Sequence, residues 1–142
     1  MGRVYSVNFE NVAVTAAQDF FEISPADDKP VKILGLFLSQ STELGEAAEE
    51  MLRIQVIRGH STGGSGGSTA TAVAIDSGDA VAGFAAEVNN TTIASAGTAV
   101  IIHSDTFNVR AGLQLFWTPE TAPIAKQGDT TIVVRLLANP AD

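Results

Sequence analysis

The chain has 142 residues and no cysteine, and sixteen acidic against eight basic residues give a formal net charge of −8. A chain of this length is expected to form one domain with its own core. The lack of cysteine excludes disulfides, zinc–thiolate sites and cysteine nucleophiles. The negative charge disfavours nucleic acid as a partner. Because 45% of the residues are hydrophobic and only 17% are charged, we expect some apolar surface to face another subunit.

The N-terminal segment does not have the features of a signal peptide. Residues 1–9 (MGRVYSVNF) lack an apolar core, and no run in the chain approaches the ~20 apolar residues that span a bilayer. The start of the chain also fits a myristoylation pattern, but it coincides with a predicted strand and no basic patch follows. We therefore expect a soluble protein with no export signal and no membrane partner.

The first third of the chain predicts strands separated by bends and turns. Arg3–Phe9 alternates between polar and apolar residues, as in a half-buried strand. Asn11–Ile23 predicts two extended pieces with a bend or bulge at Thr15–Gln18, because the apolar parity changes there. After a turn at Pro25–Pro30, Val31–Leu38 is apolar on both faces and predicts a central strand.

The middle of the chain contains the one predicted helix and a glycine-rich loop. Thr42–Glu50 predicts a short acidic helical insert. Leu52–Ile57 alternates, and we expect Leu52, Ile54 and Val56 to share one face. Gly59–Ser68 (GHSTGGSGGS) holds five glycines, which predicts a flexible loop.

The second half again predicts short strands. Thr106–Arg110 and Leu113–Trp117 are expected to pair as a hairpin through Ala111-Gly112, because two residues are a favoured loop length. The other predicted strands are Ala72–Ile75, Val88–Ile93 and Thr98–His103 around the turn Ala94–Gly97, and Thr130–Leu137. Short strands without strand–helix alternation predict an all-β fold, a single antiparallel β-sandwich domain over residues 1–142.

Several short patterns suggest chemistry but lack the context it needs. Gly59–Gly63 matches G-x-S-x-G, yet the glycine-rich residues that follow cannot start the helix of a nucleophile elbow. His60 and His103 could bind a metal with Asp76 or Asp105, but isolated histidines are usually structural.

Acidic and aromatic residues offer two further patterns. The glutamates of Thr42–Glu50 could form an acidic face for a hard cation, but such faces are usually solvated. Trp117 beside Glu120 could stack on a sugar, although a lone tryptophan is more often core or interface. We predict no catalytic residue, no cofactor site and no metal site, and hence no enzyme.

Three segments carry a resemblance to known proteins: Ala17–Ile23 (AQDFFEI), Leu38–Ser41 (LSQS) and Trp117–Glu120 (WTPE). In their order along nearly the whole chain they resemble uncharacterised small virion structural proteins of phages and prophages. The resemblance implies a jelly-roll sandwich and a structural role in the virion, as in a capsid decoration (cement) protein. It implies no catalytic residues.

Composition and resemblance together predict a subunit that works by packing against copies of itself, with a trimer favoured, and against a capsid or other particle protein. It would be made in the host cytoplasm and located in the virion. Two alternatives stay open: a receptor- or carbohydrate-binding module of a tail fibre, and a self-assembling extracellular filament subunit completed by an edge strand of the next copy. The predicted interface residues are Ile33, Leu34, Leu36, Phe37, Leu38, Phe116 and Trp117.

Overall fold

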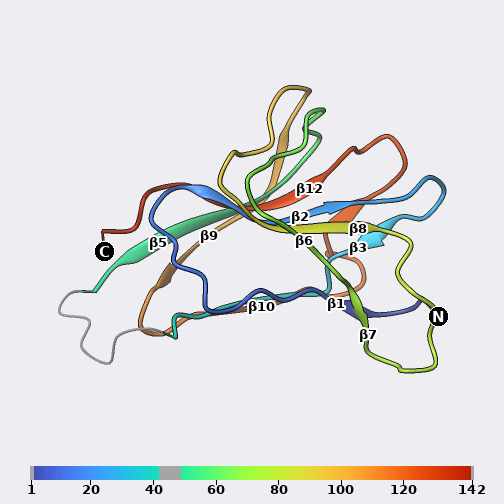
Figure 1. Ribbon diagram of the computed structural model, residues 1–142, viewed down its shortest axis with the longest axis horizontal. Coiled ribbons are helices and arrows are strands. Elements are labelled where there is room, and N and C mark those ends of the chain that lie inside the picture. The colour runs from blue at the N-terminus through green and yellow to red at the C-terminus, as the bar shows by residue number, and fades with distance from the viewer. Residues whose placement is uncertain (1, 42–48, 142) are drawn as a thin grey trace.

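The computed structural model describes residues 2–41 and 49–141. Within these residues the protein is all-β, with twelve strands and no helix (Figure 1). The strands are β1 (Tyr5–Ser6), β2 (Gln18–Ser24), β3 (Val31–Lys32), β4 (Gly35–Leu38), β5 (Met51–Arg58), β6 (Ser68–Ala70), β7 (Val73–Ala74), β8 (Ala85–Asn90), β9 (Val100–Asn108), β10 (Leu113–Phe116), β11 (Ile124–Ala125) and β12 (Ile132–Leu136).

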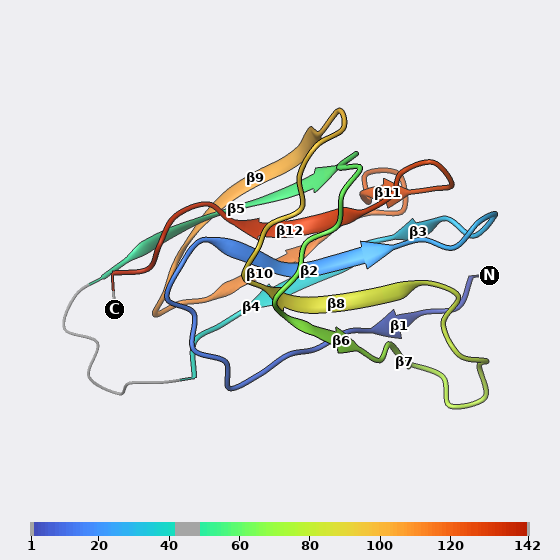
Figure 2. The same cartoon turned by 45° about the horizontal axis from the view of Figure 1, so that its top comes forward.

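Six strands form one antiparallel sheet in the order β6-β8-β2-β12-β5-β9. Three two-stranded sheets accompany it: β10-β4, β1-β7 and β11-β3. In Figures 1 and 2 the β10-β4 and β1-β7 pairs lie across from the large sheet, which gives a sandwich-like arrangement of two layers. The predicted all-β antiparallel fold is thus confirmed for the described residues.

The strand pairs are nested along the chain. β2 pairs with β12, β3 with β11, β4 with β10, and β5 with β9, so each pair encloses the next. Together these pairs follow one long antiparallel ribbon that passes from one layer to the other. A further pairing of β12 with β5 joins two turns of this ribbon inside the large sheet.

The core lies between the two layers. Leu52, Ile54 and Val56 on β5 all point into it, as their alternation predicts. The opposite layer contributes buried Leu36 and the partly buried Leu113, Leu115 and Trp117. The other buried members are Phe20, Ile23, Ala86, Phe107, Ala125, Ile132, Val134 and Leu136.

A β-bulge changes the side-chain pattern of β2. The register against β12 skips Phe20, so that Asp19 and Phe21 oppose consecutive residues. Phe20 and Phe21 can then both pack at the core, while Asp19 and Glu22, three residues apart, share the other face of the sheet. The bend predicted at Thr15–Gln18 is present at Ala16, and the bulge at Phe20 follows it in the chain.

Three strand predictions were wrong. Thr98–His103 and Thr106–Arg110 are not separate strands, because both fall largely within β9. Val31–Leu38 is not one central strand: it is divided into β3 and β4, which pair with different partners. Thr106–Arg110 and Leu113–Trp117 do not form a hairpin, because β9 pairs with β5 and β10 pairs with β4. The Ala111-Gly112 turn exists, with Gly112 at φ 71°, but it leads the chain from one layer to the other.

The predicted helical insert Thr42–Glu50 lies largely outside the described residues. Its last two residues, Glu49 and Glu50, are described and are not helical. No helix in the described ranges is long and apolar enough to cross a membrane.

Candidate functional site

An exposed aromatic pair lies on the outer face of the β4–β10 ribbon. Phe37 is 57% exposed and Phe116 is 74% exposed, and their rings meet edge to face with centroids 5.0 Å apart. Phe116 lies directly opposite Gly35. A Cβ atom at Gly35 would contact both rings, at 3.4 and 3.5 Å, so the glycine leaves room for the pair to lie over the backbone.

The seven predicted interface residues differ in their exposure. Leu34, Phe37 and Phe116 are exposed large hydrophobic residues. The other four, Ile33, Leu36, Leu38 and Trp117, pack in or against the subunit's own core. We call the three exposed residues Leu34, Phe37 and Phe116 the aromatic patch.

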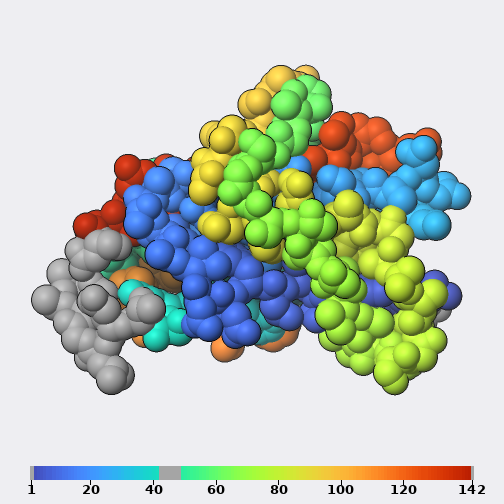
Figure 3. Space-filling view, in the orientation of Figure 1, coloured from blue at the N-terminus to red at the C-terminus, as the bar shows by residue number. Residues whose placement is uncertain are grey.

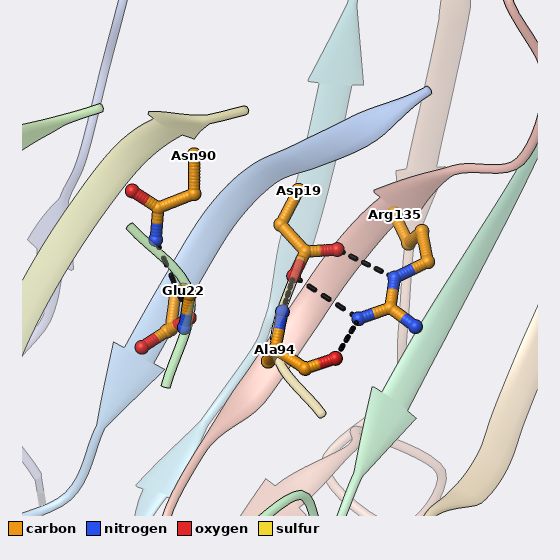
Figure 4. Close-up of polar contacts among 6 residues, drawn as sticks. Asp19, Glu22, Asn90, Ala94 and Arg135 are labelled. Atoms are coloured by element: carbon orange, nitrogen blue, oxygen red, sulfur yellow. Dashed lines mark hydrogen bonds and ion pairs between the residues drawn. The ribbon is translucent and has the colours of Figure 1, made fainter. Parts of the chain in front are cut away.

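The opposite face of the large sheet carries a buried ion pair that the sequence did not reveal. Asp19 is fully buried, and Arg135 donates to it through Nε at 2.6 Å and through a terminal nitrogen at 3.1 Å. The Asp19 carboxylate also accepts a hydrogen bond from the Ala94 amide, and Arg135 donates to the Ala94 carbonyl, at 2.7 and 2.8 Å (Figure 4). The pair thus holds both backbone groups of one loop residue.

A second carboxylate on the same face holds a second loop. Glu22 is 4% exposed and accepts hydrogen bonds from the Gly64 amide at 2.7 Å and from the Asn90 side chain at 3.3 Å. Burial is the main cause that raises the pKa of Glu22, and the nearby charges of Glu87 and Asp19 act in the same direction. The two hydrogen bonds act in the opposite direction and offset part of this effect.

The two loops above this face are joined to each other. Thr62 and Ser95 exchange two backbone hydrogen bonds of 3.0 and 2.9 Å, and Ser65 and Thr92 exchange two of 2.9 Å. The segment predicted as a flexible loop, Gly59–Ser68, therefore has defined backbone partners in the folded chain. Beneath the loops lies a small second core of Ile57, Ala94 and Val133.

The histidines do not lie together. His60 is buried, and neither of its ring nitrogens has a hydrogen-bond partner among the described residues. His103 lies on β9, 3.2 Å from Asp105, with its ring edge to face against Trp117. Across residues 2–41 and 49–141, no three histidine, cysteine or acidic side chains form a group that could hold a metal ion.

The aromatic patch is thus the candidate functional site. Its two rings remain 57% and 74% exposed, whereas the buried polar groups on the other face act between the sheet and its own loops. Comparisons with protein-family models, with curated proteins and with solved structures found no match for this chain.

Proposed function

We propose that the protein is a virion structural subunit, a capsid decoration (cement) protein that acts as a homo-oligomer, with three copies packed through the aromatic patch. The observation that carries this proposal is the exposed Phe37–Phe116 pair, because two large rings in contact with each other and open to water are typical of an interface core. Leu34 is also exposed, at 43%.

We also propose that the sandwich is a jelly roll. The nested strand pairs support this topology, because a jelly roll can be viewed as one long antiparallel ribbon wound into two sheets. The return pairing of β12 with β5 fits such winding.

The energy available from the patch is of the right size for assembly. Burial of one phenylalanine side chain contributes about 1.5–3 kcal/mol. Two rings per copy can therefore dominate the affinity of an interface whose other contacts mainly exclude water.

The test compares the oligomeric state and capsid binding of three proteins. We expect the natural chain to be oligomeric in size-exclusion chromatography with light scattering, and to sediment with shells assembled from the major capsid protein of the phage or prophage that encodes it. The variant Phe37→Ser/Phe116→Ser should be folded, monomeric and unbound. A matched control, Val100→Ser/Ile101→Ser, removes two exposed apolar side chains from β9 and should behave like the natural chain.

Two outcomes contradict the proposal. A natural chain that stays monomeric at high concentration and does not bind shells rules out a decoration subunit. If the β9 control is the variant that loses association, the filament alternative is favoured, because Val100 and Ile101 lie on the last strand of the large sheet.

The exposed rings also keep the tail-fibre alternative open. Phe37 and Phe116 present aromatic surface to water, and aromatic rings are suitable platforms for sugars. A glycan array separates the two functions: specific binding that Phe116→Ser removes favours a carbohydrate-binding module, and a decoration subunit should give no specific signal.

A further inference from the structure

A crevice of about 1420 Å³ opens between the N-terminal segment and the β3–β4 region. Its floor belongs to the large sheet and includes Phe21, Ile23 and Val134. Figure 3 shows the N-terminal segment, in dark blue, lying across this side of the molecule. The crevice is distinct from the buried polar face beneath the loops, but its lining includes Leu34, Phe37 and Phe116 of the aromatic patch.

The crevice follows the edges of two extended segments. Every residue from Gly2 to Phe9 lines it, and so does every residue from Lys29 to Phe37. Successive side chains of a strand point to opposite faces, so a cavity under one face would meet only alternate residues. On β4 the crevice touches both buried Leu36 and exposed Phe37, which places it along the strand's edge.

Both edges are open within the described part of the chain. There β1 pairs only with β7, and β4 pairs only with β10. An extended peptide between them would have a strand edge on each side and an apolar floor below. Backbone hydrogen bonds to a sheet edge, with pockets for alternate side chains, are the basis of recognition by strand addition.

The charges around the crevice select an acidic partner. Arg3, Lys29, Lys32 and Lys126 line it, which is half of all basic residues in a chain with sixteen acids, and no acidic residue of the described ranges lines it. Arg3 is 3.6 Å from Asp79, and Lys32 donates to the Pro119 carbonyl, whereas Lys29 and Lys126 are exposed. Figures 1 and 2 place the N-terminus and β3 at the same end of the molecule.

The geometry points to a docking site for an extended peptide of a partner protein, with alternating apolar residues and a cluster of carboxylates at one end. The apolar side chains pack over the sheet, and the carboxylates lie among the lysines. An anionic amphiphile such as a fatty acid would satisfy the charges and the apolar floor but not the two strand edges. This inference does not depend on the virion role.

The experiment measures the binding of fluorescein-labelled decapeptides to the full chain by fluorescence anisotropy. Two probes each contain seven residues of alternating valine and threonine. One probe has three glutamates added at its C-terminal end, and the other has them at its N-terminal end. We expect one of the two directions to bind. The same peptide with lysines in place of the glutamates should bind about tenfold more weakly or not at all, and N-methylation of alternate backbone nitrogens should weaken binding by about tenfold or more.

Variants of the protein test the charge contribution separately from the fold. Lys29→Glu and Lys126→Glu should each weaken binding by about fivefold, and the double variant should favour the lysine peptide. The control Arg53→Glu makes the same charge change at an exposed residue of β5 that does not line the crevice, and should leave binding within about twofold. Thermal melting verifies that each variant is folded.

Three outcomes would overturn the inference. They are no binding by either glutamate peptide, equal binding by the N-methylated peptide, and binding of laurate at Lys29 and Lys126 when the peptides do not bind. Light scattering of the same samples reports the oligomeric state, so a monomer that binds the peptide would support this site while contradicting the proposed self-association.

Discussion

The carboxylates of Asp19 and Glu22 lie under two loops and bind them by hydrogen bonds. Each accepts a hydrogen bond from one loop amide, Ala94 for Asp19 and Gly64 for Glu22. Arg135 compensates the charge of Asp19 directly, whereas Glu22 has only amide donors. A buried charge with no cationic partner is costly, which is why the pKa of Glu22 is raised.

The raised pKa of Glu22 predicts the sign of a pH effect on stability. Between the ordinary pKa of a glutamate and the raised value in the folded state, the folded chain binds the proton more strongly than the unfolded chain. The contribution of Glu22 to the free energy of unfolding is therefore larger at acidic pH, and it is lost as the pH rises through the raised pKa. Glu22→Gln keeps an oxygen acceptor for the Gly64 amide. We expect the free energy of unfolding of this variant, relative to that of the natural chain, to increase as the pH increases.

Urea unfolding at about pH 5 and about pH 8 measures this difference. The control is Glu120→Gln, which makes the same substitution at an exposed residue. A Glu22→Gln variant that loses the same stability at both pH values would contradict the expected coupling.

The burial of these acids could not have been predicted from the sequence. Asp19 and Glu22 stand in a strand among phenylalanines, where a charged residue normally faces water. Their burial depends on the β-bulge at Phe20 and on loops about forty and seventy-five residues away in the chain. The exposed Phe37 and Phe116, in contrast, were among the predicted interface residues because large apolar side chains are easy to recognise.

At the scale of elements, the glycines of residues 59–68 allow this loop to pack closely against neighbouring backbone and side chains, in addition to making it conformationally free. A Cβ atom at Gly64 would lie 2.5 Å from the Thr92 carbonyl oxygen and 3.1 Å from a carboxylate oxygen of Glu22. Gly67 approaches the β8 backbone even more closely. The glycine content alone predicted only a flexible loop, because the residues that these glycines pack against are distant in sequence.

We predict that Gly64→Ala lowers the free energy of unfolding by about 1–3 kcal/mol, the usual cost of overpacking. The matched control is Gly78→Ala, where a Cβ atom would meet only an Asp76 carboxylate oxygen at 3.3 Å, and its effect should be within about 0.5 kcal/mol. Hydrogen exchange gives a second measurement: the amides of Ser65 and Thr92 should be protected in the natural chain and exchange faster in Gly64→Ala. Equal stability of the two variants would mean that the loop does not pack as described.

The strands that lie inside the large sheet, with a paired strand on each side, were predictable from their own sequence. The alternation of β5 and the apolar run of β12 are such cases. The division of Val31–Leu38 was not predictable, because it reflects a change of partner from β11 for β3 to β10 for β4, and these partners are distant in sequence. The same reason explains why Leu113–Trp117 suggested a local hairpin.

At the scale of the whole molecule, the all-β antiparallel class followed from short strands without intervening helices, and the structure confirms it. The nested pairing could not be inferred, since it joins the two halves of the chain from β2 with β12 inward to β5 with β9. The charge distribution was also hidden: half of the basic residues gather at one crevice although they are scattered in sequence.

This distribution predicts opposite salt dependences for the two proposed associations, self-association and peptide binding. Copies of a chain with a net charge of −8 repel one another, and the aromatic patch must associate against that repulsion. Salt shortens the range of the repulsion, with a screening length of about 10 Å at 0.1 M, so self-association should become stronger between about 20 and 300 mM NaCl. Binding of an acidic peptide at the lysine-lined crevice should become weaker over the same range.

Sedimentation equilibrium and peptide anisotropy, measured in the same buffers, check both trends. The Phe37→Ser/Phe116→Ser variant should remain monomeric at every salt concentration, and Lys29→Glu should reduce the salt dependence of peptide binding. If self-association weakens with salt, ion pairs and not the exposed rings hold the copies together, because apolar contacts do not depend on screening. Because Phe37 and Phe116 also line the crevice, copies of the chain and an acidic strand would compete for adjoining parts of one surface, and salt would shift the balance toward self-association.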